Sequence, residues 1–210
     1  MIKIKNKKLK KSSKEWVSRQ NRDFYVKKAR EIGYRSRSSF KLLDIHEKFS
    51  LIKNNINILE LGSSPGGWSQ VYSKINSNGK NLAIDILPMK EIDNIIFHLG
   101  DFKEISIQKK INDFFGLKNL DILLSDMAPN ATGNKEIDSI KINSLAVDVL
   151  NFSLLLLSKN GWLITKYYSG KDEKDLIATS KKNFKKTNLY KPLSSRKDSK
   201  EMYLVSCGLI

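Results

Sequence analysis

The chain has 210 residues, a formal net charge of +16 and 40% hydrophobic residues, a size that suits one α/β domain with a sizeable core and short extensions. Its single cysteine, Cys207, excludes an intramolecular disulfide and is typical of a reducing compartment, and its two distant histidines, His46 and His98, do not predict a zinc site. No uninterrupted apolar run approaches the roughly 18 residues that span a bilayer, and no apolar stretch of an export signal follows the basic N-terminus. We therefore expect a cytoplasmic protein without a membrane anchor.

Positive charge is concentrated in the two flanks of the chain. Lys and Arg outnumber Asp and Glu by 15 to 3 in residues 1–41 and by 10 to 4 in residues 171–200, whereas residues 42–170 carry 13 against 14. Because lysines and arginines replace phosphate counterions, this asymmetry indicates a polyanionic partner such as RNA. A merely solvated lysine-rich surface is the alternative. This alternative is disfavoured for residues 1–41, where aromatic residues and arginines interleave. For residues 171–200, the two explanations are equally well supported.

The N-terminal region divides into a tail and two helices. Residues 1–15 form a basic tail with seven lysines in its first 14 positions and little that could pack, so we expect it to be disordered until it binds. A single domain then spans residues 16–210, since we find no internal repeat and no interior linker. Within residues 16–50, one helix is expected near Ser18 to Ile32. A second opens after a link, residues 33–38, whose serine can cap it and whose arginines, Arg35 and Arg37, would face RNA.

Apolar runs of strand type then alternate with helical segments. The longest helical segment repeats apolar residues at roughly helical spacing from Ile137 to Leu156. This alternation predicts an α/β fold with a mostly parallel sheet and helices on both faces. The strand-type runs are Ile56–Leu61, Leu82–Ile86, Ile95–Leu99, Leu120–Ser125, Trp162–Tyr167 and Met202–Cys207, with a weaker run near Leu189.

The first apolar run leads directly into a glycine turn and a helix start, in the sequence ILELGSSPGGWSQ from Ile58 to Gln70. Gly62, Gly66 and Gly67 can take positive φ and lack Cβ, so the backbone can lie against a ligand, as in a Rossmann-like domain. The spacing is not G-x-G-x-x-G and there is no P-loop lysine, which disfavours a pyrophosphate group. Asp85 closes the second run, where a carboxylate can meet ribose hydroxyls. These features favour a nucleoside cofactor without pyrophosphate, of which S-adenosylmethionine is the commonest, over a simple tight connection.

Four charged residues stand at the ends or on the core-facing sides of predicted elements. Two of them follow strands, whose carboxyl ends form the ligand-binding edge of an open α/β sheet. A lysine directly after Trp-Leu-Ile-Thr is costly to bury unless it has a partner or a task. Taken singly, each is better explained as an exposed, solvated charge. The four residues are Lys41, Asp126, Lys166 and Glu201.

Seven motifs stand in order from Arg35 to the C-terminus: RSRSSFK at 35–41, LGSSPGGWSQ at 61–70, DILPM at 85–89, GDF at 100–102, LSDMAPN at 124–130, Lys166, and KPLSSRKDSKEMY at 191–203. They resemble the motifs of the FtsJ (RrmJ, RlmE) family of ribosomal RNA 2′-O-methyltransferases. The resemblance implies a Rossmann-like class I methyltransferase that uses S-adenosylmethionine, with a seven-stranded, mostly parallel sheet whose last strand is antiparallel. It also implies that the acceptor is a uridine ribose in large-subunit ribosomal RNA, either free or in the large ribosomal subunit. We expect a monomer without a metal.

The same motifs imply roles for individual residues. The family's catalytic Lys-Asp-Lys-Glu tetrad falls on Lys41, Asp126, Lys166 and Glu201. Lys166 would be the general base that accepts the ribose proton, with Lys41 favouring its neutral form and the two carboxylates opposing it. The donor contacts fall on Gly62, Gly66, Trp68, Asp85, Asp101 and Asp126.

Two positions depart from the family pattern. Glu60 stands where relatives usually have aspartate, and Tyr167-Tyr168-Ser169 replaces a more apolar segment. Two other functions also stay open. One is 2′-O-methylation of a tRNA anticodon loop or an mRNA cap, of which the cap version is disfavoured because the chain is compact. The other is an inactive RNA-binding assembly factor, which would have no need of Lys166 or Asp126 at strand ends.

Overall fold

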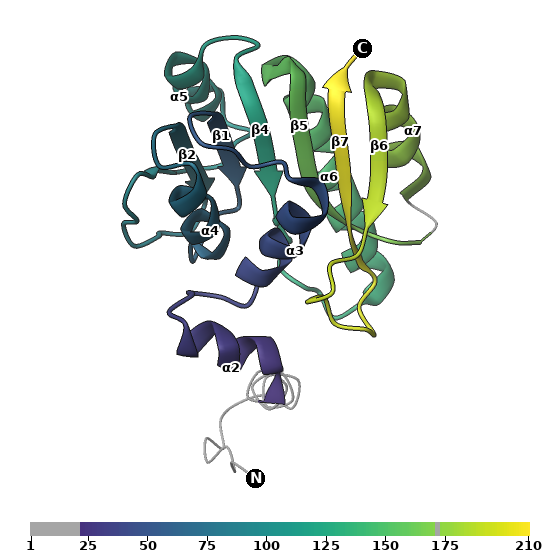
Figure 1. Ribbon diagram of the computed structural model, residues 1–210. Helices are drawn as coiled ribbons and strands as arrows, with labels where there is room; N and C mark the ends of the chain where they lie inside the picture. The colour runs from purple at the N-terminus through teal and green to yellow at the C-terminus, as the bar shows by residue number, and fades with distance from the viewer. Residues whose placement is uncertain (1–21, 171–172) are drawn as a thin grey trace.

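The computed structural model of the protein describes residues 22–170 and 173–210. One sheet has the strand order β3-β2-β1-β4-β5-β7-β6 (Figure 1). Neighbours from β3 to β5 pair in parallel, and β7 lies antiparallel between β5 and β6. This confirms the predicted mostly parallel sheet with an antiparallel last strand. The strands are β1 Asn57–Leu61, β2 Lys80–Asp85, β3 Ile96–Leu99, β4 Leu120–Ser125, β5 Leu157–Tyr168, β6 Phe184–Tyr190 and β7 Glu201–Leu209.

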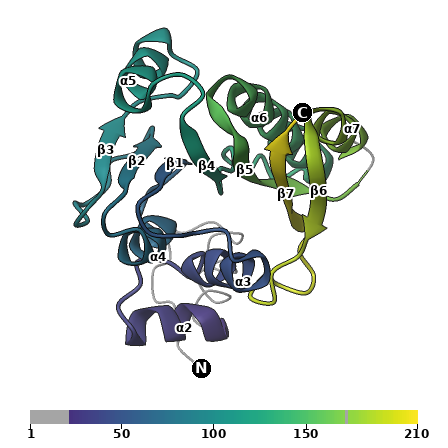
Figure 2. The ribbon, with the colours of Figure 1, turned by 45° about the horizontal axis from the view of Figure 1, so that its top comes forward.

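Helices cover both faces of the sheet, as predicted (Figure 2). The helices α3 and α4 lie on one face, and α5, α6 and α7 lie on the other, while α2 stands outside the sheet ahead of α3. The bounds are α2 Phe24–Glu31, α3 Ser39–Phe49, α4 Gly67–Ile75, α5 Ile105–Phe115, α6 Lys135–Leu156 and α7 Lys174–Asn183.

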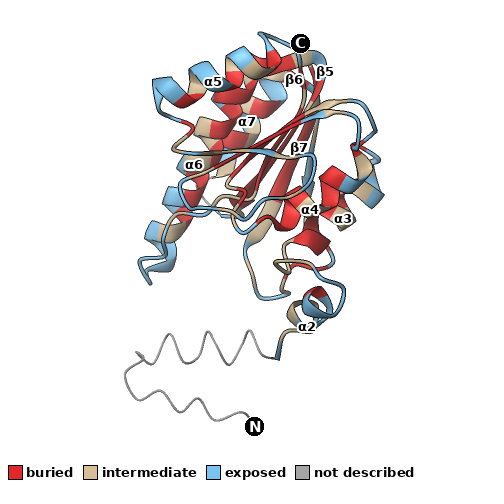
Figure 3. Ribbon diagram, turned by 90° about the vertical axis from the view of Figure 1, so that its left-hand side faces the viewer, coloured by how far each residue is buried: buried red, intermediate tan, exposed pale blue. Residues whose placement is uncertain are grey.

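Alternate residues of the central strands supply two separate cores. Ile58 and Ile164 pack with the α3 and α4 side, whereas Leu59 and Leu163 pack with the α5, α6 and α7 side. Figure 3 shows the buried residues running along the strands between the helix layers. Burial on both faces explains why these strands read as continuous apolar runs rather than as alternating patterns.

The element ends differ from the predicted ones in places. The expected first helix is described only as α2, which begins after Asp23, whose carboxylate accepts hydrogen bonds from Tyr25 N and Val26 N. Residues 1–21, including the tail, lie outside the described residues. The weak run near Leu189 is the full strand β6, whose pattern was faint because most of its side chains are exposed at the sheet edge. Strand β5 starts at Leu157, directly after α6.

Helix α6 has the length and hydropathy of a membrane-spanning helix, which we did not expect in any segment of the sequence. By length and composition alone, Lys135–Leu156 is long and apolar enough to cross a membrane. Half of its most apolar window is buried inside the structure, where Val149 and Leu150 pack against the sheet. A buried core helix of a globular domain accounts for this hydropathy. In its first turns, Ile137 and Ile140 are exposed.

Candidate active site at the carboxyl edge of the sheet

The glycine turn between β1 and α4 packs tightly against the segment that follows β4. Gly62 has φ +79°, and a Cβ there would come within 2.2 Å of Met127 Cγ. Gly66 caps α4 with φ +105°, a conformation that favours glycine. Positive φ, predicted for Gly62, Gly66 and Gly67, is found at Gly62 and Gly66 but not at Gly67, and the close neighbour of Gly62 is Met127 of the same chain.

Arg35 fastens this turn to the loop after β2. Its guanidinium donates hydrogen bonds to the carbonyl oxygens of Pro65 (3.2 Å), Lys90 (2.7 Å) and Glu91 (2.7 Å). Arg37 likewise pairs with Asp23 and donates to a carbonyl oxygen of the loop before β7. Both arginines were expected to face RNA. Their guanidinium groups instead bond to the protein itself, because the backbone carbonyls of these loops need donors.

The predicted donor carboxylates lie along the same edge. Asp85 Oδ2 accepts the N–H of Ser64 at 2.7 Å, and Oδ1 accepts the N–H of Leu87 at 2.8 Å. Asp101, after β3, accepts the N–H of Lys103 at 2.9 Å. Both carboxylates are half-buried, and an ionised carboxylate has about four acceptor sites, so each retains capacity for ribose hydroxyls.

Trp68, also predicted to contact the donor, is 1% exposed. Its indole N–H donates to the carbonyl oxygen of Ser38 at 2.8 Å, and its ring lies 5.7 Å from that of Tyr203. The side chain therefore supports α3 and β7 from inside the core. The family resemblance implied a donor contact for Trp68, and the structure shows that packing directs its ring into the core.

Glu60 is buried in β1, just before the glycine turn. It is 2% exposed, and its carboxyl accepts a hydrogen bond from the Ser69 hydroxyl on α4. Burial raises the pKa of Glu60 to about 8, although the Ser69 and Tyr72 hydroxyls favour its charged form. Near neutral pH this position therefore carries mostly a protonated carboxyl.

The four charged residues from distant segments form one cluster. Lys166 Nζ lies 3.1 Å from Asp126 Oδ1 and donates to the Asp126 carbonyl oxygen at 2.5 Å. Lys41 Nζ lies 2.7 Å from Glu201 Oε2 and 3.8 Å from Asp126 Oδ1. The elements α3, β4, β5 and β7 supply one residue each, at or just beyond the carboxyl end of the parallel strands. Two ammonium groups and two carboxylates balance, which lowers the cost of burying them.

The cluster favours the charged forms of Asp126 and Lys41. Burial alone would raise the pKa of Asp126, but the Lys166 and Lys41 ammonium groups and the Tyr203 hydroxyl outweigh it and lower that pKa. Burial alone would lower the pKa of Lys41, but the Asp126 and Glu201 carboxylates outweigh it and raise that pKa. Asp126 is thus held as a carboxylate and Lys41 as an ammonium group.

Two contacts in the cluster were not foreseen. Tyr203 OH donates to Asp126 Oδ1 at 2.6 Å, and Ser195 Oγ donates to Glu201 Oε1 at 2.9 Å. Tyr203 follows Glu201 by two residues in a strand, so the period-2 rule could have placed both on one face. Ser195 lies in a loop and gave no such signal.

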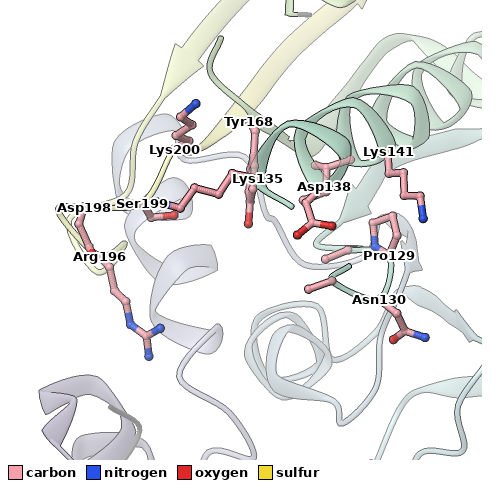
Figure 4. A pocket seen from close by; sticks show the side chains of 13 residues that line it. Pro129, Asn130, Lys135, Asp138, Lys141, Tyr168, Arg196, Asp198, Ser199 and Lys200 are labelled. Atoms are coloured by element: carbon pink, nitrogen blue, oxygen red, sulfur yellow. The ribbon is translucent and has the colours of Figure 1, made fainter. Parts of the chain in front are cut away.

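A cavity of about 510 Å³ opens beyond the cluster, between the segment after β4, the start of α6 and the loop before β7. Figure 4 shows Tyr168 projecting into it between the side chains of Lys135 and Asp138. Lys141, Arg196 and Lys200 also line it. Within residues 22–170 and 173–210, no group of three His, Cys, Asp or Glu residues is placed to hold a metal ion.

Comparison with known proteins agrees with this arrangement. The family model of the FtsJ-like methyltransferases matches residues 34–209. A Pelagibacter ubique protein named ribosomal RNA large subunit methyltransferase E is 43% identical over 92% of this chain and 95% of its own. A Francisella philomiragia protein of the same name is 37% identical over 94% and 96%. A solved Plasmodium falciparum structure, provisionally described as a ribosomal RNA methyltransferase, superposes with a TM-score of 0.76 at 29% identity over 84% of this chain and 98% of its own. The chain belongs to the FtsJ-like methyltransferase family.

Proposed function

We propose that this protein transfers a methyl group from S-adenosylmethionine to the 2′-hydroxyl of a uridine ribose in large-subunit ribosomal RNA. The names of its relatives supply the RNA class. The observation that carries the reaction type is the Lys-Asp-Lys-Glu cluster, which lies at the same sheet edge as the glycine turn. Lys200, the residue before Glu201, lines the neighbouring cavity. A protein with this activity would act in the cytoplasm, where it meets ribosomal RNA or the large subunit.

The donor side of the edge suits a cationic nucleoside. Asp85 and Asp101 present carboxylates to ribose hydroxyls, and Asp126 adds a negative charge beside the turn. The guanidinium of Arg35 is taken up by backbone carbonyls, and the turn itself contains no lysine, so a pyrophosphate would lack a cationic partner there. S-adenosylmethionine supplies an electrophilic methyl group on a sulfonium ion.

The position of Lys166 suits a general base. A neutral lysine amine has two N–H groups and one lone pair, and Asp126 offers two acceptors to Nζ, its carbonyl oxygen and Oδ1. If both N–H groups are held there, the lone pair is left for the acceptor hydroxyl. Lys166 then takes the proton as the ribose oxygen attacks in line, an assistance usually worth about 10² to 10⁴ in rate.

Lys41 and Glu201 orient this base. Their ion pair at 2.7 Å fixes an ammonium group 3.8 Å from Asp126 Oδ1, the same carboxylate oxygen that Lys166 contacts at 3.1 Å. The Tyr203 hydroxyl donates a hydrogen bond to the Asp126 carboxylate, and the Ser195 hydroxyl donates one to the Glu201 carboxylate. The cluster therefore keeps Lys166 in place during the transfer.

The test uses the purified protein, labelled donor and large-subunit ribosomal RNA from cells that lack the gene. Label should enter the RNA, and alkaline hydrolysis of that RNA should leave a gap at the modified nucleotide, because cleavage needs a free 2′-hydroxyl. Label on base atoms without a gap would refute 2′-O transfer. Label confined to tRNA in total RNA would favour the tRNA alternative, and absence of transfer with intact RNA binding would favour an inactive assembly factor.

A further inference from the structure

Tyr168 is the last residue of β5 and lies two positions beyond Lys166 on the same face of the strand. Two residues of strand advance about 7 Å, so the backbone of Tyr168 lies about that far beyond that of Lys166. The ring is half-buried and borders the cavity (Figure 4). No role in the charged cluster or on the donor side accounts for an aromatic ring at this place.

The backbone of Tyr168 is held by a buried side chain of α6. Asn143, 2% exposed, accepts the Tyr168 N–H at 2.8 Å and donates to the Tyr168 carbonyl oxygen at 3.0 Å. These two bonds continue the strand where its pairing with β7 ends at Glu201. The ring is therefore presented from a fixed backbone, as a binding platform requires.

The cavity around the ring is predominantly cationic. Lys135, Lys141, Arg196 and Lys200 line it, against Asp138 and Asp198. The carboxylate of Asp138 is engaged in the structure, since it accepts both the N–H and the hydroxyl of Thr132 at 2.7 Å. Burial, followed by the nearby Glu201 carboxylate, raises the pKa of the Tyr168 hydroxyl, so the ring is neutral at physiological pH. An apolar, neutral ring among cations suits a nucleotide, with its base on the ring and its phosphates at the rim.

We propose that Tyr168 stacks against the base of the acceptor nucleotide, while the surrounding lysines and arginine contact the neighbouring phosphates. This inference rests on the proposed function and specifies how the acceptor is held. A ribose that reaches Lys166 must leave the regular stack of its strand, and an aromatic side chain replaces the lost stacking. Such a stack is worth about 5- to 150-fold in affinity per base.

The test is photo-crosslinking of a single-stranded 12-mer of uridines in which 5-iodouridine replaces uridine, followed by mass spectrometry of the crosslinked peptides. Wild type should crosslink mainly at Tyr168, and Tyr168→Phe should keep the crosslink at that position. Tyr168→Leu should lose it and bind the same RNA about 5- to 150-fold more weakly. Tyr190→Leu, the same substitution on the edge strand β6, is the matched control and should retain wild-type affinity.

Circular dichroism and thermal unfolding of each variant show whether the fold is kept. A loss of affinity in Tyr168→Leu with an unchanged melting temperature supports the stack. Wild-type crosslinks concentrated outside the cavity, or equal affinity of Tyr168→Leu and wild type, would overturn it. Neither readout depends on methyl transfer, so the result stands apart from the labelled-donor assay that tests the proposed function.

Discussion

Replacing Glu60 by glutamine should change how stability depends on pH while keeping the fold. Glutamine has nearly the same shape, and its amide oxygen can still accept the Ser69 hydroxyl. Glu60 is 2% exposed, and among the described parts of the chain no lysine, arginine or histidine forms an ion pair with it. Ionising the wild-type carboxyl therefore places an uncompensated charge in the core.

The size of the effect follows from the pKa of Glu60, which burial raises from 4.5 to about 8. The folded state keeps a proton that the unfolded chain releases, so this contribution to stability is fully present below pH 4.5 and is lost as pH rises to about 8. At about 1.4 kcal/mol per pH unit, the loss over this window is about 5 kcal/mol. For a chain of this size, that corresponds to roughly 10–20 °C in melting temperature.

Urea unfolding of wild type and Glu60→Gln at pH 5, 6, 7, 8 and 9 measures the difference directly. The free energy of unfolding of the variant minus that of wild type should increase with each step in pH. This difference should level off above about pH 8. Glu47→Gln, on the exposed side of α3, is the matched control and should follow wild type at every pH. A constant difference between Glu60→Gln and wild type across this range would refute the reasoning.

Three further predictions concern the donor, the base and the tail. Lys166→Ala should lower methyl transfer by at least about two decades with donor affinity close to wild type, and single-turnover rates that stay high would remove its assignment as base. Asp85→Ala should weaken donor binding in calorimetry but leave RNA affinity nearly unchanged; unaltered donor affinity would argue against its ribose contact. Deleting residues 1–14, which lie outside the described residues, should keep the fold. The slope of log RNA affinity against log salt should become shallower by roughly 3 to 5. Equal slopes for the full-length and the truncated protein would contradict a role of this tail in RNA binding.

The sheet could be predicted largely from the sequence because its central strands are buried on both faces. Runs such as Leu120–Ser125 leave little choice of element, whereas the exposed edge strand β6 gave only a weak signal. The charged cluster could not be predicted from local sequence patterns. Nothing local connects Lys41 with Glu201, which are 160 positions apart, and only the family resemblance associated them before the structure brought them together.

Side-chain direction was the least predictable property. The family resemblance implied a donor contact for Trp68, but no local pattern indicated that its ring lies inside the core. Arg35 and Arg37 looked like RNA contacts by charge, yet each donates to backbone carbonyls that the loops leave unpaired. Such partners depend on where distant loops come to rest, which no local pattern records.

The insertion of β7 between β5 and β6 has a consequence for how the protein is made. Strand β7, which is synthesised after the other six strands of the sheet, carries Glu201 and Tyr203 and also joins β6 to the rest of the sheet. A nascent chain that has released everything up to β6 therefore has neither a complete sheet nor a complete charged cluster. Because both are finished by the same segment, a chain that stops before β7 would lack the complete charged cluster and the complete sheet together.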